Sequence, residues 1–292
     1  MRAAVAAAAL GALVLGATGC GERAEPTTAH VSPYPVSVHG AGEHVTAMTS
    51  RPERIVPLAP GVAELLSDLG ARGQLVAGRA GSTGIWKLSG QELARAVQQL
   101  DPDLIVASST TEPGDLARIR RAGAPVYQIP ERSLRDIGRA LTHLGLLTDH
   151  AVRARALVGE NERARRAVAA RVRGRPVLRV FIDTGFFTTV SSRTLISDLI
   201  SIAGGRNVAG PRPEPGPFSL RQLRRLDPQV YLATADSETT LRYLRRNPRT
   251  RGLSAVENGR FRLIDPSFLS PDGRVEPRLT ALARWIHPDA FR

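Results

Sequence analysis

The stretch TDHAVRARALVGENERARRAVAARVRG, residues 148–174, lies mid-chain and divides the sequence into two halves. Asp149 is a plausible N-cap, and Gly174 followed by Pro176 supplies a stop, so the pattern predicts one helix over 149–174. About 24 helical residues span roughly 36 Å, the length of a small lobe. A thin apolar stripe is typical of a helix lying across two lobes, and here it comprises Val152, Ala156, Ala164, Val168 and Val172.

The half before this helix alternates short β-rich runs with amphipathic windows. The runs that predict strands are 54–58, 74–78, 103–108 and 125–130. Apolar residues three and four apart predict helices over 61–70, 91–100 and 114–123. Strand–helix alternation favours a mostly parallel sheet covered on both faces. We therefore expect an N-terminal α/β lobe over residues 51–148.

The half after the helix repeats this organisation over residues 175–292. Its predicted strands are 177–183, 229–235 and 260–265, and its predicted helices are 194–205, 220–226 and a last one around 279–286. The two halves also echo each other. LSDLGARGQLVAG (66–78) is similar to LISIAGGRNVAG (199–210), and QQLDPDLIVAS (98–108) is similar to RRLDPQVYLAT (224–234). Similar turn chemistry at every helix–strand connection would explain either echo alone, but their shared order favours two related, Rossmann-like lobes.

The N-terminal end resembles an export signal followed by an attachment point. A basic start and a short apolar run predict a signal peptide over residues 1–19, too short to span a bilayer. LGATGC (15–20) resembles a bacterial lipobox, in which Cys20 is lipidated, although Ala17 stands where that motif usually has leucine. Ordinary secretion with a free thiol is the alternative. Cys20 is the only cysteine, so no disulfide can form within the chain.

Residues 20–50 are rich in polar residues, proline and glycine and lack apolar periodicity, so we expect a tether between lipid and fold. The net charge of +13 invites a nucleic-acid interpretation. The arginines, however, are spread along the chain in helix-like strings interleaved with acids, which is typical of solvated helix faces. We therefore expect no nucleic-acid partner.

Two α/β lobes joined by one long helix, exported and lipid-anchored, resemble the helical-backbone class of substrate-binding proteins of ABC importers. Within that class the sequence is most similar to the iron-siderophore, haem and vitamin B12 binders. The resemblance covers roughly residues 51–290 and rests on RPERIVPLAPGVAELLSDLGA, LDPDLIVAS, AGAPVYQIPERSLRDIGRALTHLG, SDLISIAGGRNVAG and PFSLRQLRRLDPQVYLAT. It implies a monomer, without cofactor or enzymatic activity, that captures an iron complex or a corrinoid and delivers it to an ABC permease and its ATPase.

The resemblance also implies site residues. In such proteins a glutamate on each lobe pairs with arginines of the permease, and Glu64 falls on the N-lobe position; its charge could instead complement the positive helix end. Arg221 stands at the matching C-lobe position, which puts symmetric docking in doubt, and nearby Glu214 could substitute. For the ligand, the resemblance and the loop positions indicate Trp86, Phe186, Phe187, Arg193 and Arg274.

Most of these ligand residues have a structural alternative. Trp86 could be a core residue, one of the two phenylalanines is expected to be core, and Arg274 could belong to a structural loop. Axial haem ligation would need a side chain such as Tyr127, Tyr231 or Tyr243, of which two fall in predicted strands.

Other classes of function fit less well. The six histidines lack ligand spacing, so we expect no metal site. An exported chelatase-like or hydrolytic enzyme would show a phosphate loop or a nucleophile motif, and none is present. A lipid-anchored ligand sensor without a transporter remains open, and Arg221 is the feature that favours it.

Overall fold

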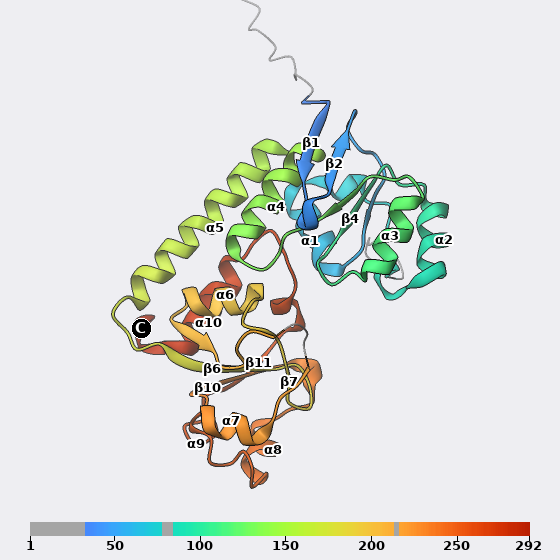
Figure 1. Ribbon diagram of the computed structural model, residues 1–292. Coiled ribbons are helices and arrows are strands. Elements are labelled where there is room, and N and C mark those ends of the chain that lie inside the picture. The colour runs from blue at the N-terminus through green and yellow to red at the C-terminus, as the bar shows by residue number, and fades with distance from the viewer. Residues whose placement is uncertain (1–32, 78–83, 213–215) are drawn as a thin grey trace, which may run out of the picture. The chain divides into compact units, whose positions relative to one another are not determined.

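The computed structural model describes residues 33–77, 84–212 and 216–292 (Figure 1). The predicted signal peptide, Cys20, the first part of the tether and Glu214 lie outside these ranges. Two parallel sheets, each with helices on both faces, and a long helix between them in the chain confirm the predicted two-lobed α/β fold.

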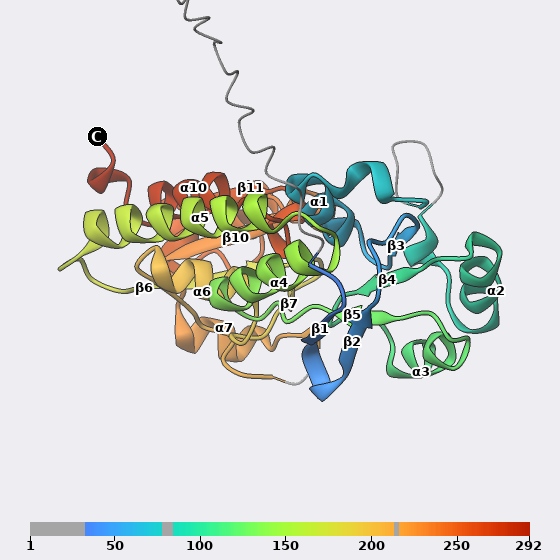
Figure 2. The ribbon, with the colours of Figure 1, turned by 90° about the horizontal axis from the view of Figure 1, so that it is seen from above.

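The N-terminal lobe is built on a parallel sheet with strand order β3-β4-β5. Its strands are β3 (Ile55–Pro57), β4 (Leu104–Ala107) and β5 (Val126–Gln128). Its helices are α1 (Pro60–Leu69), α2 (Gly90–Leu100), α3 (Pro113–Arg121) and α4 (Leu134–Leu147). In Figure 2, α2 and α3 lie together on the side of β4 away from α4.

Side chains of successive strand residues lie on opposite faces of this sheet. Ile55, Leu104 and Val106 belong to the apolar cluster that includes α1 and α4. Val56 and Ile105, their chain neighbours, belong to the cluster that includes α2 and α3. Because side chains alternate along a strand, unbroken apolar runs are required where both faces are covered. The strand predictions rested on such runs, and three of the four in this lobe are confirmed.

The C-terminal lobe has a parallel sheet with strand order β11-β10-β6-β8. Its strands are β6 (Leu178–Asp183), β8 (Gly205–Asn207), β10 (Val230–Thr234) and β11 (Phe261–Ile264), with a small antiparallel pair, β7 (Thr188–Thr189) and β9 (Gly216–Pro217). Its helices are α6 (Leu195–Ile202), α7 (Leu220–Leu226), α8 (Leu241–Arg246), α9 (Ser254–Glu257) and α10 (Glu276–Ile286). One face packs on α6 and α10, and the other on α7, α8 and α9.

The two sequence echoes occupy equivalent positions in the two sheets. After α1, Leu75 pairs in parallel with Ile55 at the edge beside the first strand, as β8 pairs with β6 after α6. After α2 and α7 the chain turns at Asp101 and Asp227, both in the left-handed conformation with φ of 41° and 42°. Asp101 is followed by Pro102 and β4, and Asp227 is followed by Pro228 and β10. The echoes therefore mark a shared topology, as expected for related lobes.

The long helix α5 (Ala151–Val172) packs against α4 and α10 (Figures 1 and 2). Its N-cap is His150 rather than Asp149, which precedes the helix with a φ of 65°. Ala164, Val168 and Val172 are buried as predicted, but Val152 and Ala156 are exposed. The buried face instead begins with Ala154, Leu157 and Asn161.

Asn161 explains why the sequence pattern placed the stripe wrongly. Its Nδ2 donates to the Gly273 carbonyl at 2.9 Å, and its Oδ1 accepts from the Val275 amide at 3.2 Å. A polar residue in a helix is read as exposed from sequence, yet here it satisfies two buried backbone groups of a distant segment. The buried face of α5 therefore includes an asparagine, which a search for apolar periodicity does not count as buried.

Two segments differ from the sequence prediction. Residues expected to form the tether contain an antiparallel hairpin of β1 (Val36–His39) and β2 (Val45–Met48). Val38 and Met48 are buried in the same cluster as α4. The predicted strand 74–78 is reduced to the single bridge at Leu75 after a 3-10 turn. Within the described ranges, no helix has the length and apolarity needed to cross a bilayer.

Candidate functional site

Parallel sheets commonly bind ligands beyond the carboxyl ends of their strands, and in the C-terminal lobe β6 ends there at Asp183. This carboxylate is fully buried. Its Oδ1 accepts from the Gly185 amide at 2.9 Å, and its Oδ2 accepts from the Tyr231 hydroxyl at 2.7 Å and the Thr239 hydroxyl at 2.9 Å. Asp183 therefore joins the loop after β6 to β10 and to the loop after it.

The loop after β6 is a tight turn that presents Phe186. Gly185, Phe186 and Phe187 have φ values of 129°, 50° and 60°, which non-glycine residues rarely adopt. The turn is closed by the Thr188 amide, which donates to the Gly185 carbonyl at 2.7 Å. Phe186 is 82% exposed, whereas Phe187 packs into the C-lobe core beside Tyr243, with ring centroids 6.4 Å apart. This agrees with the expectation that one of the two rings is core.

Arginines flank this turn. Arg193 is exposed, and its amide donates to the Ser191 hydroxyl at 3.1 Å. The same hydroxyl accepts from the Arg212 amide at 3.1 Å, so Ser191 joins the loops after β7 and β8. The Arg212 guanidinium stacks over the Phe218 ring at 5.1 Å. Arg212 did not emerge from the sequence, because nothing in its local pattern separates it from the many other arginines.

In the N-terminal lobe Trp86 is half-buried. It packs against the cluster that covers β4 on the α2 side. Its indole lies over Gly84, where an added Cβ would stand 2.4 Å from the ring. Gly84 is therefore required for this placement of the ring. The structure gives Trp86 both a core contact and a solvent-accessible part.

Hydroxyl side chains follow β4 at the carboxyl edge of the N-terminal sheet. The Glu131 carboxylate accepts from the Ser109 amide at 2.8 Å and from the Ser109 hydroxyl, and the hydroxyls of Ser108 and Thr110 are 2.6 Å apart. Burial raises the pKa of Glu131, and its buried Oε2 has no hydrogen-bond partner among the described residues. The sequence signal for this cluster is the run SSTT (108–111) directly after a buried strand.

Arg274 is held by the opposite lobe. Its Nε lies 3.1 Å from the Asp68 carboxylate at the end of α1. Burial raises the pKa of Asp68, and the charge of Arg274 opposes that rise. This pairing fits the structural-loop alternative for Arg274, and ligand contact by Arg274 stays a prediction.

Glu64 is exposed on α1. Its charge helps raise the pKa of Asp272, although burial of Asp272 is the larger cause. Arg221 is exposed on α7, and Glu214 lies outside the described residues.

The candidate haem ligands are mostly occupied. Tyr127 is buried and its hydroxyl lies 3.0 Å from His143 Nδ1, and burial raises the pKa of Tyr231, which donates to Asp183. Tyr243 is 49% exposed. Among the described residues, no three His, Cys, Asp or Glu side chains converge as a metal site would require.

Comparison with known proteins places the chain in a family. Residues 95–268 match the family model described as periplasmic binding protein. This chain belongs to the periplasmic binding protein family. The match covers the second half of the N-terminal lobe, α5 and most of the C-terminal lobe, so it includes Phe186, Phe187 and Arg193.

Relatives of this periplasmic binding protein are named for the ligand they bind. A protein of Halobacterium salinarum named a cobalamin-binding protein is 30% identical over 191 residues, which cover 60% of this chain and 51% of the relative. The chain thus spans about half the length of the curated relatives that it matches.

Solved structures share the fold. CeuE of Helicobacter pylori, in complex with nickel and histidine, has a TM-score of 0.76 at 14% identity and covers 88% of this chain and 89% of its own. The vitamin B12 binding protein BtuF of Vibrio cholerae has a TM-score of 0.69 at 20% identity and covers 82% of this chain and 98% of its own.

Proposed function

We propose that this periplasmic binding protein captures a corrinoid outside the cytoplasm and delivers it to an ABC import permease. The observation that carries the proposal is its 30% identity to a relative named a cobalamin-binding protein. The likeness in fold to BtuF agrees with it. Iron-siderophore complexes and haem are the neighbouring ligand classes that the experiment must separate.

The chemistry of the strand ends supports a large, flat ligand. Phe186 exposes an aromatic face on a turn held by Asp183, and Trp86 leaves part of its indole accessible. Exposed aromatic rings lose water on contact with an apolar macrocycle, and such burial is favourable by about 25 cal/mol per Å². Arg193 adds a cation for the polar substituents of the ligand. Phe187, which packs into the C-lobe core, would hold the turn in place.

Delivery requires docking on a permease, and Glu64 is the proposed contact. It is exposed on α1, and no side-chain ion pair engages it among the described residues. Glu64→Ala should abolish uptake while ligand affinity stays unchanged, and unaltered uptake would retire this role. Glu214 is the proposed second contact, and the same assay of Glu214→Ala tests it.

A lipid anchor at Cys20 would keep the protein at the extracytoplasmic face of the membrane. Several acyl chains hold a protein durably, since each buried methylene contributes roughly 0.8 kcal/mol. Cys20→Ala should move the protein from the membrane fraction to the soluble fraction after cell lysis. Retention of Cys20→Ala in the membrane fraction would contradict lipidation at this residue.

The proposed ligand is tested by fluorescence and calorimetric titration of the purified protein with cyanocobalamin, haem and a panel of ferric siderophores. We expect saturable one-to-one binding of cyanocobalamin, weakened about tenfold or more in Trp86→Ala, because one stacked ring contributes on the order of 1 kcal/mol or more. Trp285→Phe is the matched control, because Trp285 stacks on Phe268 with centroids 5.6 Å apart. No binding of cyanocobalamin would overturn the proposed ligand, and binding of haem or a ferric siderophore in its place would assign the neighbouring ligand class.

A further inference from the structure

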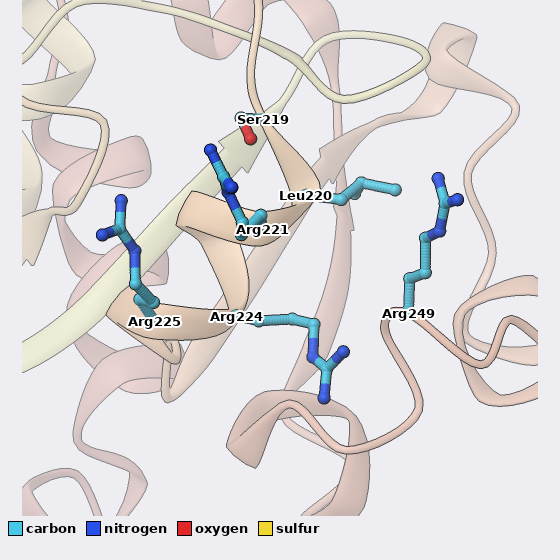
Figure 3. A pocket seen from close by; sticks show the side chains of 6 residues that line it. All are labelled: Ser219, Leu220, Arg221, Arg224, Arg225 and Arg249. Carbon is cyan, nitrogen blue, oxygen red and sulfur yellow. The ribbon is translucent and has the colours of Figure 1, made fainter.

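Four arginines surround a hollow on the C-terminal lobe. Its volume is about 750 Å³, and it is lined by Ser219, Leu220, Arg221, Arg224, Arg225 and Arg249. The first five belong to α7 or its N-cap, whereas Arg249 comes from the segment after α8. Figure 3 shows the arginine side chains extending from α7 in different directions, with Leu220 pointing toward Arg249.

The charges of this arginine hollow are unbalanced within the described chain. All four arginines are exposed, and none forms an ion pair or a side-chain hydrogen bond there. Other arginines of the protein are paired, such as Arg165 with Glu162 at 2.7 Å and Arg179 with Asp227 at 3.4 Å. The helix sequence LRQLRRL contains no acid that could pair along its own face. A cluster of like charges in a concavity attracts anions.

We infer that the arginine hollow docks an acidic segment of a partner protein, which, if the proposed function holds, is the import permease. Guanidinium groups bind carboxylates in paired, directional hydrogen bonds. The hollow is concave and includes the apolar Leu220, so it fits a protruding segment that carries carboxylates beside an apolar side chain. A flat bilayer surface would contact the rim and leave the hollow unfilled.

The two lobes would then present opposite charges to the partner. Glu64 offers a negative charge on the N-terminal lobe, while the arginine hollow offers positive charge on the C-terminal lobe. A partner with the complementary pair of charges would accept the protein in one orientation and resist the reversed one, because like charges would then face each other. The arginine hollow is thus the alternative to Glu214 as the C-lobe contact, and it would reverse the charge of docking at that lobe.

The test compares two double charge reversals of equal net effect. Arg221→Glu with Arg224→Glu alters the hollow, and Arg155→Glu with Arg163→Glu alters exposed positions on α5. We expect cyanocobalamin uptake by cells to fall at least tenfold with the hollow variant and to stay near wild type with the α5 variant. Calorimetry should give unchanged cyanocobalamin affinity for both. Equal uptake by both variants would overturn the inference.

A second arm does not depend on transport. Purified wild-type protein should bind a fluorescent peptide of alternating glutamate and leucine, and the hollow variant should bind it at least tenfold more weakly than the α5 variant. Equal weakening in both would show attraction by net charge alone and contradict a docking site. Binding to phosphatidylglycerol vesicles that depends on the hollow, without peptide binding, would assign the surface to the membrane instead. Failure to bind cyanocobalamin would refute the proposed function while this arm still decides the inference.

Discussion

At the scale of single residues, Asp183 holds the candidate site together. It lies at the end of β6 and accepts hydrogen bonds from residues 48 and 56 positions away, Tyr231 and Thr239. Those bonds fix the start of a turn in which two phenylalanines adopt positive φ. Such backbone strain persists only where the surroundings hold it. No local pattern could have indicated this, because the partners are distant in sequence.

Asp183→Asn should lower the free energy of unfolding by about 1 to 3 kcal/mol, because the new amide group would face two hydroxyl donors. Tyr231→Phe removes one of the bonds and should cost about 1 kcal/mol. Urea unfolding measures both. An Asp183→Asn variant as stable as wild type would contradict the anchoring role.

Asp272 gives the protein a pH-dependent contact near Glu64. It pairs with the buried Arg278 at 2.5 Å, yet burial raises the pKa of Asp272 to about 6, and the charges of Asp68 and Glu64 contribute to the rise. A pKa raised on folding means that the folded state favours the protonated form. The associated stability is fully present below about pH 4 and is lost as the pH rises through about 6.

Asp272→Asn mimics the protonated form, so its advantage over wild type should grow with pH. We expect the difference in unfolding free energy to shift by about 3 kcal/mol in favour of the variant between pH 4 and pH 7, since each pKa unit corresponds to 1.36 kcal/mol. Exposed Asp236→Asn is the control and should change stability by no more than about 0.5 kcal/mol. A pH-independent difference for Asp272→Asn would contradict the raised pKa.

At the scale of elements, α5 was predictable in extent but not in its contacts. Capping and composition gave a helix over 149–174, and the structure has Ala151–Val172. The buried face escaped prediction at its N-terminal half, because Asn161 faces inward and Val152 faces solvent. The close approach of α4 to α5 at Gly145 also has no sequence signal.

Two glycine-to-alanine changes separate packing from helix propensity. At Gly145 a Cβ would stand 2.4 Å from the Ala154 Cβ, so Gly145→Ala should destabilise the protein by about 1 to 3 kcal/mol. At Gly159 the nearest atom is the flexible Arg163 guanidinium at 3.4 Å, so Gly159→Ala should stabilise by up to about 1 kcal/mol. Thermal unfolding of both variants checks the signs. Equal changes in thermal stability for the two variants would mean that α4 and α5 are not in tight contact at Gly145.

At the scale of the whole molecule, the sequence predicted two related lobes because both lobes use apolar strands and the same helix–strand connection. Buried parallel strands need unbroken apolar runs, and the Leu-Asp-Pro connections end α2 and α7 in the same left-handed turn. The hairpin β1–β2 was missed because its strands are short and half polar. Of the candidate site, Phe186 was indicated by its loop position and Trp86 by the resemblance to known binders. Arg212 and Glu131, in contrast, are defined by contacts that only the fold creates.

In the proposed function, one ligand is held by the strand ends of both lobes. Hydrogen exchange with and without cyanocobalamin measures this in solution. We expect the backbone amides of residues 84–88 and 184–188 both to gain protection in the complex, while those of α7 do not change. Protection confined to one lobe, or centred on α7, would contradict it.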